Sequence, residues 1–272
     1  MKLSPIWIAA FFTLAPCPLR ALAARDEIQV VLPGVEAKFS LPQLLSKLKK
    51  VSVTIDDPEY KRSKTFEGFL LADLLKEAGL SDTSPGDEVV FTAKDGYSPN
   101  TSFDMIRAHR AIVAFREKGK SSFEKLAQGK AMVSPAPYYL VWEEGSKLAD
   151  KVPWPYQLVK IEVVNFKVKF GKLYPDGVAT DSSVMKGFLT FKNQCVRCHS
   201  INLQGGDVGP ELNAPLNVTE YWPIDTLKRF IRDAPSFRYK SKTPPFPQLD
   251  EQQVDHVIEY LKHMKELKIR TP

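Results

Sequence analysis

Two cysteines and a histidine stand close together at Cys195, Cys198 and His199, in the pattern C-x-x-C-H. The thiols of such a pair can each add across one vinyl group of a haem, because the gap between them matches the separation of the vinyls. The adjacent histidine then lies beneath the ring, where its imidazole binds the iron. The spacing therefore predicts one covalently bound haem c, attached at both cysteines and ligated by His199.

A redox-active CxxC pair and half of a zinc site are the two alternatives to this interpretation. A structural zinc site needs about four ligands, and no second CxxC or histidine pair follows at a suitable spacing. A thioredoxin-like pair follows a strand in a βαβ pattern, whereas Cys195 ends a short helical pattern. Haem attachment therefore fits the sequence better than either alternative.

The N-terminus has the layout of a cleaved signal peptide. A positive start at Lys2 precedes an apolar run at residues 6–14, and residues 21–23 form an A-x-A cleavage site. The apolar run is shorter than the about 20 residues that span a bilayer. We therefore expect residues 1–23 to be removed, and the product to be periplasmic without an integral membrane segment.

Cysteine usage and charge narrow the function classes further. Cys17 follows a proline, whereas a lipoprotein signal has a small residue there, so we do not expect lipid anchoring. The mature chain keeps Cys195 and Cys198 alone, which excludes a disulfide framework. The formal charge of +6 falls to about +4 without the leader, and no basic–aromatic motif accompanies it, so nucleic-acid binding is not expected. About 250 mature residues are enough for two domains.

Residues 24–172 read as a mixed α/β domain. Alternating or continuous apolar runs predict strands, and a helical stripe at residues 69–78 ends at Gly79. The predicted strands are residues 51–55, 88–93, 111–115, 138–142 and 158–164.

The order of these segments resembles the molybdopterin-binding core of the sulfite oxidase family over about residues 48–166. The resemblance rests on FEGFLLADLLKEAG at 66–79, VVFTAKDGYS at 89–98 and WPYQLVKIEVV at 154–164. In that family a cysteine ligates molybdenum, and basic residues hold the pterin phosphate. Residues 24–172 contain no cysteine. The resemblance therefore implies a sulfite-oxidase-like fold without molybdopterin, kept as a scaffold, docking module or binding surface.

Residues 173–182 are polar and rich in turn formers, which predicts a linker to a second domain at 183–272. From Val184 to about Lys268 the chain resembles the class I cytochrome c domain, which implies an all-α fold. Gly187, Phe191 and Cys195 then lie near one face of the first helix, which in that family meets the C-terminal helix. The resemblance also implies that the Pro210 carbonyl accepts the N–H of the proximal imidazole.

Two further helices are expected in this domain. Residues 225–233 predict a helix with Asp225 as its cap, and Asp250 is expected to cap the last helix. The apolar stripe of the last helix comprises Val254, Val257, Ile258, Leu261 and Met264.

The sixth iron ligand is left open. Where the family usually has Met-Pro-Pro-Phe, with the methionine sulfur on the iron, this chain has Thr243-Pro244-Pro245-Phe246. Loss of the thioether lowers the expected reduction potential, because Met/His ligation raises it. A five-coordinate iron and a water ligand are two options, and the candidate protein ligands are Lys240, Lys242, Met264, Met105 and His109.

Basic residues cluster in the same domain, at Lys228, Arg229, Arg232, Arg238, Lys240 and Lys242. Such a rim can steer an acidic redox partner towards the haem edge; the alternative is a solvated basic surface without a partner. No acid–base or nucleophilic constellation stands out, so we expect electron transfer rather than catalysis by side chains. A haem-based ligand sensor and a haem subunit or fused acceptor of an oxidoreductase are the alternative functions.

Overall fold

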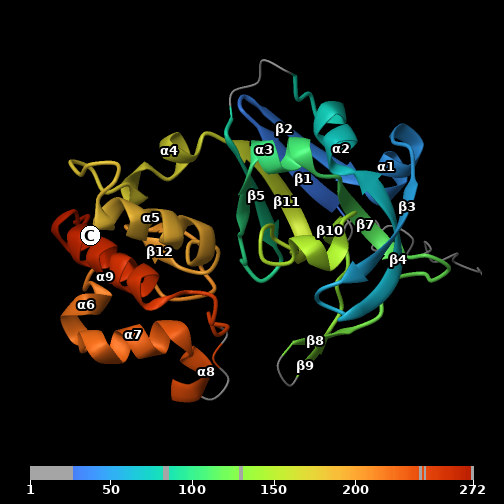
Figure 1. The fold of residues 1–272 in the computed structure, drawn as a ribbon. Coiled ribbons are helices and arrows are strands. Elements are labelled where there is room, and N and C mark those ends of the chain that lie inside the picture. The colour runs from blue at the N-terminus through green and yellow to red at the C-terminus, as the bar shows by residue number, and fades with distance from the viewer. Residues whose placement is uncertain (1–26, 82–85, 129–130, 239–240, 242, 271–272) are drawn as a thin grey trace, which may run out of the picture.

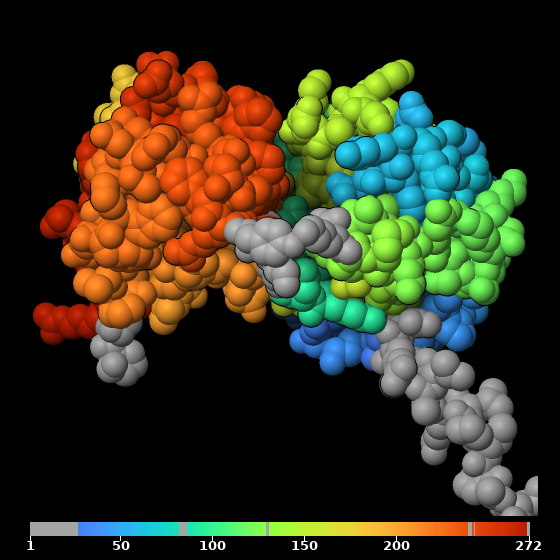
Figure 2. Space-filling view, turned by 90° about the horizontal axis from the view of Figure 1, so that it is seen from below, coloured from blue at the N-terminus to red at the C-terminus, as the bar shows by residue number. Residues whose placement is uncertain are grey.

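The computed structural model describes residues 27–81, 86–128, 131–238, 241 and 243–270. The predicted signal peptide at 1–23 lies outside these residues. A mixed α/β part and a mainly helical part lie side by side, and β5 (Glu88–Ala93) faces α5 (Ser183–Gln194) (Figure 1). Seen from below, a hollow separates the two parts (Figure 2).

The N-terminal part is built on a nine-stranded sheet. Its main path runs β2-β1-β11-β10-β7-β4-β3, with β5 paired to β11 and β6 paired to β5. Only the β1–β11 pairing is parallel among the described pairs. The strands are β1 (Glu27–Leu32), β2 (Val35–Ser40), β3 (Val51–Asp57), β4 (Arg62–Leu70), β6 (Asn100–Ser102), β7 (Ala111–Glu117), β10 (Tyr138–Trp142) and β11 (Tyr156–Val164).

Short elements cover and extend this sheet. The strand β11 is shared between β1, β10 and β5, and its register shifts between Leu158 and Lys160, which bends the sheet there. A small separate hairpin is formed by β8 (Leu126–Gln128) and β9 (Ala131–Val133). The helices are α1 (Leu41–Lys47), α2 (Leu71–Glu77) and α3 (Phe103–Ala108).

The helix predicted at residues 69–78 is shorter than expected, because α2 begins at Leu71. Phe69 and Leu70 instead end β4, where they pair with Val113 and Ile112 of β7. The Phe69 ring packs 5.3 Å from that of Phe115 in the core. Tertiary pairing therefore overrides the local helical pattern at these positions.

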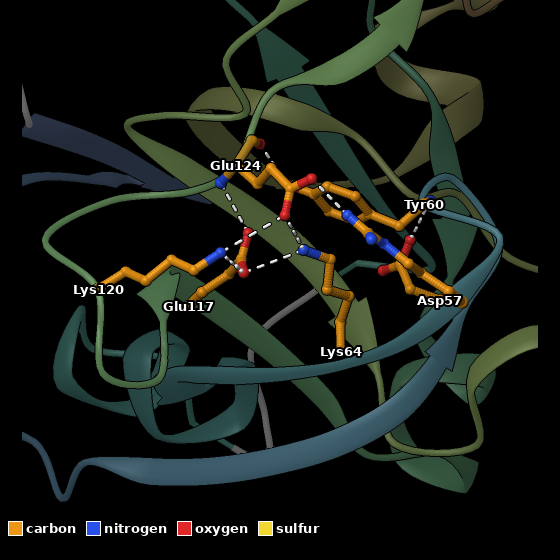
Figure 3. Close-up of polar contacts among 7 residues, drawn as sticks. Asp57, Tyr60, Lys64, Glu117, Lys120 and Glu124 are labelled. Carbon is orange, nitrogen blue, oxygen red and sulfur yellow. Dashed lines mark hydrogen bonds and ion pairs between the residues drawn. The ribbon is translucent and has the colours of Figure 1, made fainter.

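A charged cluster fastens the loop after β7 to the sheet (Figure 3). The Lys64 ammonium lies 3.0 Å from Glu117 and 2.8 Å from Glu124. The side chains of Lys64 and Glu117 are only 7% and 6% exposed, so each charge depends on the other. Lys120 approaches Glu117 from the solvent side at 2.8 Å, and the Tyr60 hydroxyl donates to the Glu124 carbonyl.

The C-terminal part is organised by the crossing of α5 with α9 (Glu251–Glu266). Phe191 of α5 and Tyr260 of α9 lie with their ring centroids 5.3 Å apart, and Gly187 allows close approach at the crossing. The remaining elements are α6 (Val218–Tyr221), α7 (Ile224–Arg232), α8 (Ala234–Phe237), β12 (Ser200–Ile201) and β13 (Gln204–Gly205).

The expected helix ends are partly correct. Asp250 caps α9, as predicted, and the structure adds a capping box with Gln253. The prediction that Asp225 caps the middle helix is wrong, because α7 begins at Ile224 with Pro223 as its cap residue. Asp225 lies in the first turn, where its charge still favours the helix dipole.

The core of the helical part begins before the predicted linker at 173–182. Phe166 of α4 (Phe166–Lys169) and Leu173 of η3 (Gly171–Leu173) are fully buried in it. The Tyr260 hydroxyl donates to the Leu173 carbonyl at 2.8 Å. Within the described residues, no helix combines the length and apolarity needed to cross a membrane.

Candidate haem-attachment site

The C-x-x-C-H motif forms a tight turn at the end of α5. Cys195 is the C-cap residue, and its N–H donates to the Phe191 carbonyl at 2.8 Å. The Cys195 carbonyl accepts from the N–H groups of Cys198 at 3.1 Å and His199 at 2.9 Å. The helix therefore fixes where the motif starts, and the turn brings its three functional residues together.

The imidazole of His199 is oriented by the loop that follows it. Its Nδ1 lies 2.9 Å from the Pro210 carbonyl oxygen, which can only accept, so Nδ1 carries the proton. A Cβ at Gly209 would lie 2.6 Å from that same nitrogen, so only glycine allows the loop this close. The remaining ring nitrogen, Nε2, is then the one with a lone pair for a metal.

Burial supports the neutral forms of both side-chain types in the motif. It lowers the pKa of His199, which favours the unprotonated imidazole that binds metals. It also raises the pKa of Cys195 to about 12. A buried thiol of this kind stays uncharged, as does the thioether that it would become.

Glu211 holds the loop that carries Pro210. Its Oε1 accepts the N–H groups of Asn202 at 2.8 Å and Asn213 at 2.9 Å. Burial alone would raise its pKa, but hydrogen bonds from Ser200 and from backbone N–H groups outweigh this and lower it. An ionised Glu211 therefore stabilises the loop that orients His199.

Three buried asparagines, which the sequence analysis missed, tie this loop to α9. The side chain of Asn213 donates to the Met264 carbonyl at 2.8 Å, and that of Asn217 donates to the Leu261 carbonyl at 2.8 Å. Asn202 donates to the Leu267 carbonyl at 3.0 Å. These bonds tie the loop to carbonyls in and just after the last turns of α9, where Met264 also accepts the Leu267 N–H. Separate asparagines in a loop give no periodic signal, so only the tertiary structure reveals them.

The donor set suits a haem better than a bare metal ion. Cys195 and Cys198 are not joined in a disulfide, and His199 offers one ring nitrogen beside them. A haem attached at the two cysteines would take one such nitrogen as an iron ligand. Among the described residues, no group of three or more His, Cys, Asp and Glu side chains is placed to hold a metal ion.

The candidate sixth ligands lie in different parts of the molecule. Met264 is 1% exposed within the helical core, whereas Met105 packs against the core of the sheet. The His109 ring lies 2.7 Å from Glu144. Thr243 is half-buried, and Lys240 and Lys242 lie outside the described residues. The identity of the sixth ligand stays open.

Two arginines, one in α7 and one directly after α8, lie on aromatic rings. Arg238 lies 5.7 Å from the ring centre of Trp222 and 6.0 Å from that of Phe230. Arg229 lies 5.8 Å from that of Phe237, which is 39% exposed. Lys228 is paired with a carboxylate, but within the described part of the chain no carboxylate pairs with these arginines.

Comparison with known proteins agrees with this geometry. A model of the family "Cytochrome c" matches residues 184–265. The C-terminal part therefore carries a cytochrome c domain, which implies a covalently bound haem c and haem-based electron transfer. A search of curated proteins finds no match to the chain. The resemblance of the N-terminal part to the sulfite oxidase family stays a prediction.

Proposed function

We propose that this protein is an exported, periplasmic monohaem cytochrome that carries single electrons between redox proteins. Cys195 and Cys198 attach the haem, and His199 binds its iron. When bound, the haem supplies the redox chemistry, because its iron cycles between Fe(II) and Fe(III). The contact of 2.9 Å between His199 Nδ1 and the Pro210 carbonyl carries the proposal, because it leaves Nε2 for the iron.

In this proposal the protein residues hold the haem and set the donor strength of its histidine ligand. They do not themselves react during electron transfer. The Pro210 carbonyl fixes the plane of the His199 ring and increases its donor strength. The proposed organisation is a signal peptide at 1–23, a sulfite-oxidase-like domain at 24–172, a linker at 173–182 and a cytochrome c domain at 183–272. N-terminal sequencing of the exported protein should begin near Ala24.

The arginine and aromatic surface of α7 and α8 is the proposed docking face for an acidic partner. Guanidinium groups that pair with no carboxylate among the described residues can steer an oppositely charged protein, and the exposed ring of Phe237 adds apolar contact area. The rate of electron exchange with such a partner should fall as ionic strength rises, because salt screens the attraction. A rate independent of salt would contradict this docking face.

Covalent attachment has a direct test. The double variant Cys195→Ser, Cys198→Ser should lose haem staining on a denaturing gel, whereas each single variant keeps one thioether and a weaker stain. Stain that survives in the double variant overturns the proposal. Visible and electron paramagnetic resonance spectra of the wild-type protein would then give the spin state and the sixth ligand.

A haem-based ligand sensor is the second candidate, favoured by Thr243 in place of the family's methionine. If no protein side chain served as the sixth ligand, a bound haem would be able to take up a diatomic gas. Rapid stoichiometric binding of carbon monoxide by the ferrous protein would support this function over electron carriage. Stoichiometric molybdenum in the purified protein would instead indicate a fused oxidoreductase.

A further inference from the structure

A turn of the N-terminal part contacts the middle of the haem-attachment motif. We call residues 94–98, which connect β5 to β6, the docking turn. The Ser98 N–H donates to the Arg197 carbonyl at 3.0 Å, and Arg197 lies between the two attachment cysteines. The Tyr97 hydroxyl lies 3.5 Å from Nη1 of Arg197, a long contact that adds little by itself.

This bond gives the last of the five carbonyls in the motif its partner. The carbonyls of Val196 and His199 both accept from the Gly206 N–H, at 2.8 and 3.2 Å, and that of Cys198 accepts from the Gly209 N–H at 2.7 Å. Those partners belong to the helical part itself. The Arg197 carbonyl, in contrast, takes its partner from the docking turn, so the carbonyls of the motif all have partners only with the N-terminal part in place.

The docking turn is held in shape by its own bonds. Asp95 accepts the Tyr97 N–H on its side chain at 3.1 Å, and the Ala93 N–H donates to the Tyr97 carbonyl at 2.9 Å. The Lys94 N–H donates to the Gln157 carbonyl of β11 at 3.0 Å. The turn therefore approaches the motif as a preformed element rather than as a loose loop.

Glycine is required at the tip of this turn. Gly96 has a φ of +87°, and a Cβ there would lie 1.9 Å from Oδ1 of Asp207, in the loop that wraps the motif. An alanine at position 96 would force the Asp207 side chain to move, and the positive φ would strain any residue with a Cβ. The close fit therefore extends from Arg197 to Asp207.

A second contact holds the helix before the motif against the strand before the turn. Lys192 of α5 lies 2.5 Å from Glu88 of β5, and these side chains are 18% and 7% exposed. The Phe166 N–H also donates to Asp87 at 2.7 Å. These two contacts fix the helical part to the start of β5, the strand that leads into the docking turn.

We propose that the docking turn is a positioning element for the haem, through which the N-terminal part sets the reduction potential. This inference rests on the proposed haem function. The Ser98 N–H takes the place of water at the Arg197 carbonyl, in a segment that is only half-buried apart from Val196, so the turn lowers solvent access there. Lower solvent access disfavours the higher charge of ferric iron. Displacing the turn should therefore lower the midpoint potential.

The test compares two glycine substitutions in the full-length, haem-loaded protein. Gly96→Ala adds a methyl group facing Asp207, whereas Gly34→Ala is a matched control, with a φ of +81° and nothing within 4 Å of its Cβ. Redox titration should give a lower midpoint for Gly96→Ala alone. Adding Asp207→Ala should restore part of the shift, because the clash is removed.

Hydrogen exchange gives a second readout that does not involve the iron. Exchange of the Ser98 amide should accelerate by about fivefold or more in Gly96→Ala, the factor expected for loss of one hydrogen bond. Tyr97→Phe, which removes only a hydroxyl, should shift the midpoint in the same direction by less. Tyr97→Phe takes the place of Gly96→Ala in the test if Gly96→Ala fails to fold.

If every variant carries haem and has the same midpoint potential as Gly34→Ala, this inference is overturned. The proposed function then stays intact. A wild-type protein without covalent haem overturns both. A lowered midpoint with accelerated Ser98 exchange supports the positioning role.

Discussion

Gly187 of α5 lies directly against the backbone of His256 in α9. A Cβ at residue 187 would be 1.9 Å from the His256 carbonyl oxygen and 2.8 Å from the Tyr260 Cβ. The oxygen belongs to a helix backbone, which cannot yield as a flexible side chain does. The two helices that frame the motif can therefore cross at this distance only with glycine at position 187.

Replacing this glycine should loosen the haem domain. Gly187→Ala should destabilise it by about 3 kcal/mol or more, because overpacking forces the helices apart. Denaturant unfolding followed at the haem absorbance measures the loss. Gly171→Ala is the matched control, since its Cβ would meet nothing within 4 Å. Equal midpoints for the two variants would show that the crossing tolerates a side chain.

In the charged cluster of the sheet, the stability lost on removing a lysine should depend on how deeply that lysine is buried rather than on how many ion pairs it makes. Lys64 and Lys120 both contact Oε2 of Glu117, but their side chains are 7% and 52% exposed. Lys64→Ala should cost about 3 kcal/mol, because it leaves a buried carboxylate poorly compensated. Lys120→Ala should cost below about 1 kcal/mol. Similar losses in urea unfolding would contradict this ranking.

Acid should weaken the same cluster. Hydrogen bonding from Lys64 lowers the pKa of Glu124 to about 2, from 4.5 in an unfolded chain. The stabilisation by this carboxylate is thus complete above about pH 4.5 and is lost as the pH falls towards 2. Glu124→Gln should therefore flatten the decline in unfolding free energy between these pH values.

Asp57 gives a control of opposite sign. It is fully buried, and burial raises its pKa. This group therefore favours the folded state more as the pH falls, so Asp57→Asn should make the acid decline steeper. A flatter decline in both variants would show that these carboxylates do not set the acid response.

The buried asparagines should matter for their hydrogen bonds rather than for their volume. Asn213 donates to Asn202 and to the Met264 carbonyl, both at 2.8 Å. Asn213→Asp keeps the size but removes the donors, and Asn213→Ala removes both, so each should cost about 2–3 kcal/mol. Asn193→Ala, at an exposed position of α5, should cost little. Full stability in Asn213→Asp would contradict the bonding role.

Local patterns predicted several strands of the sheet but not which strands pair with one another. The runs at residues 138–142 and 158–164 are strands, because branched and aromatic side chains fit a buried pleated surface. The predicted start of the helix was wrong at Phe69 and Leu70, because pairing with β7 keeps these two residues in β4. Nor does the sequence around Phe166 show that its ring joins the helical core rather than the sheet.

The sequence alone determined the chemistry of the site, because covalent attachment depends on residue type and spacing at Cys195, Cys198 and His199. It also left the sixth ligand open, since Thr243 stands where the family has a methionine. Only the tertiary structure decided that Ser98 bonds Arg197 and that Asn213 supports α9. Such contacts join residues far apart in the chain, and their energies depend on burial and geometry that no local pattern encodes.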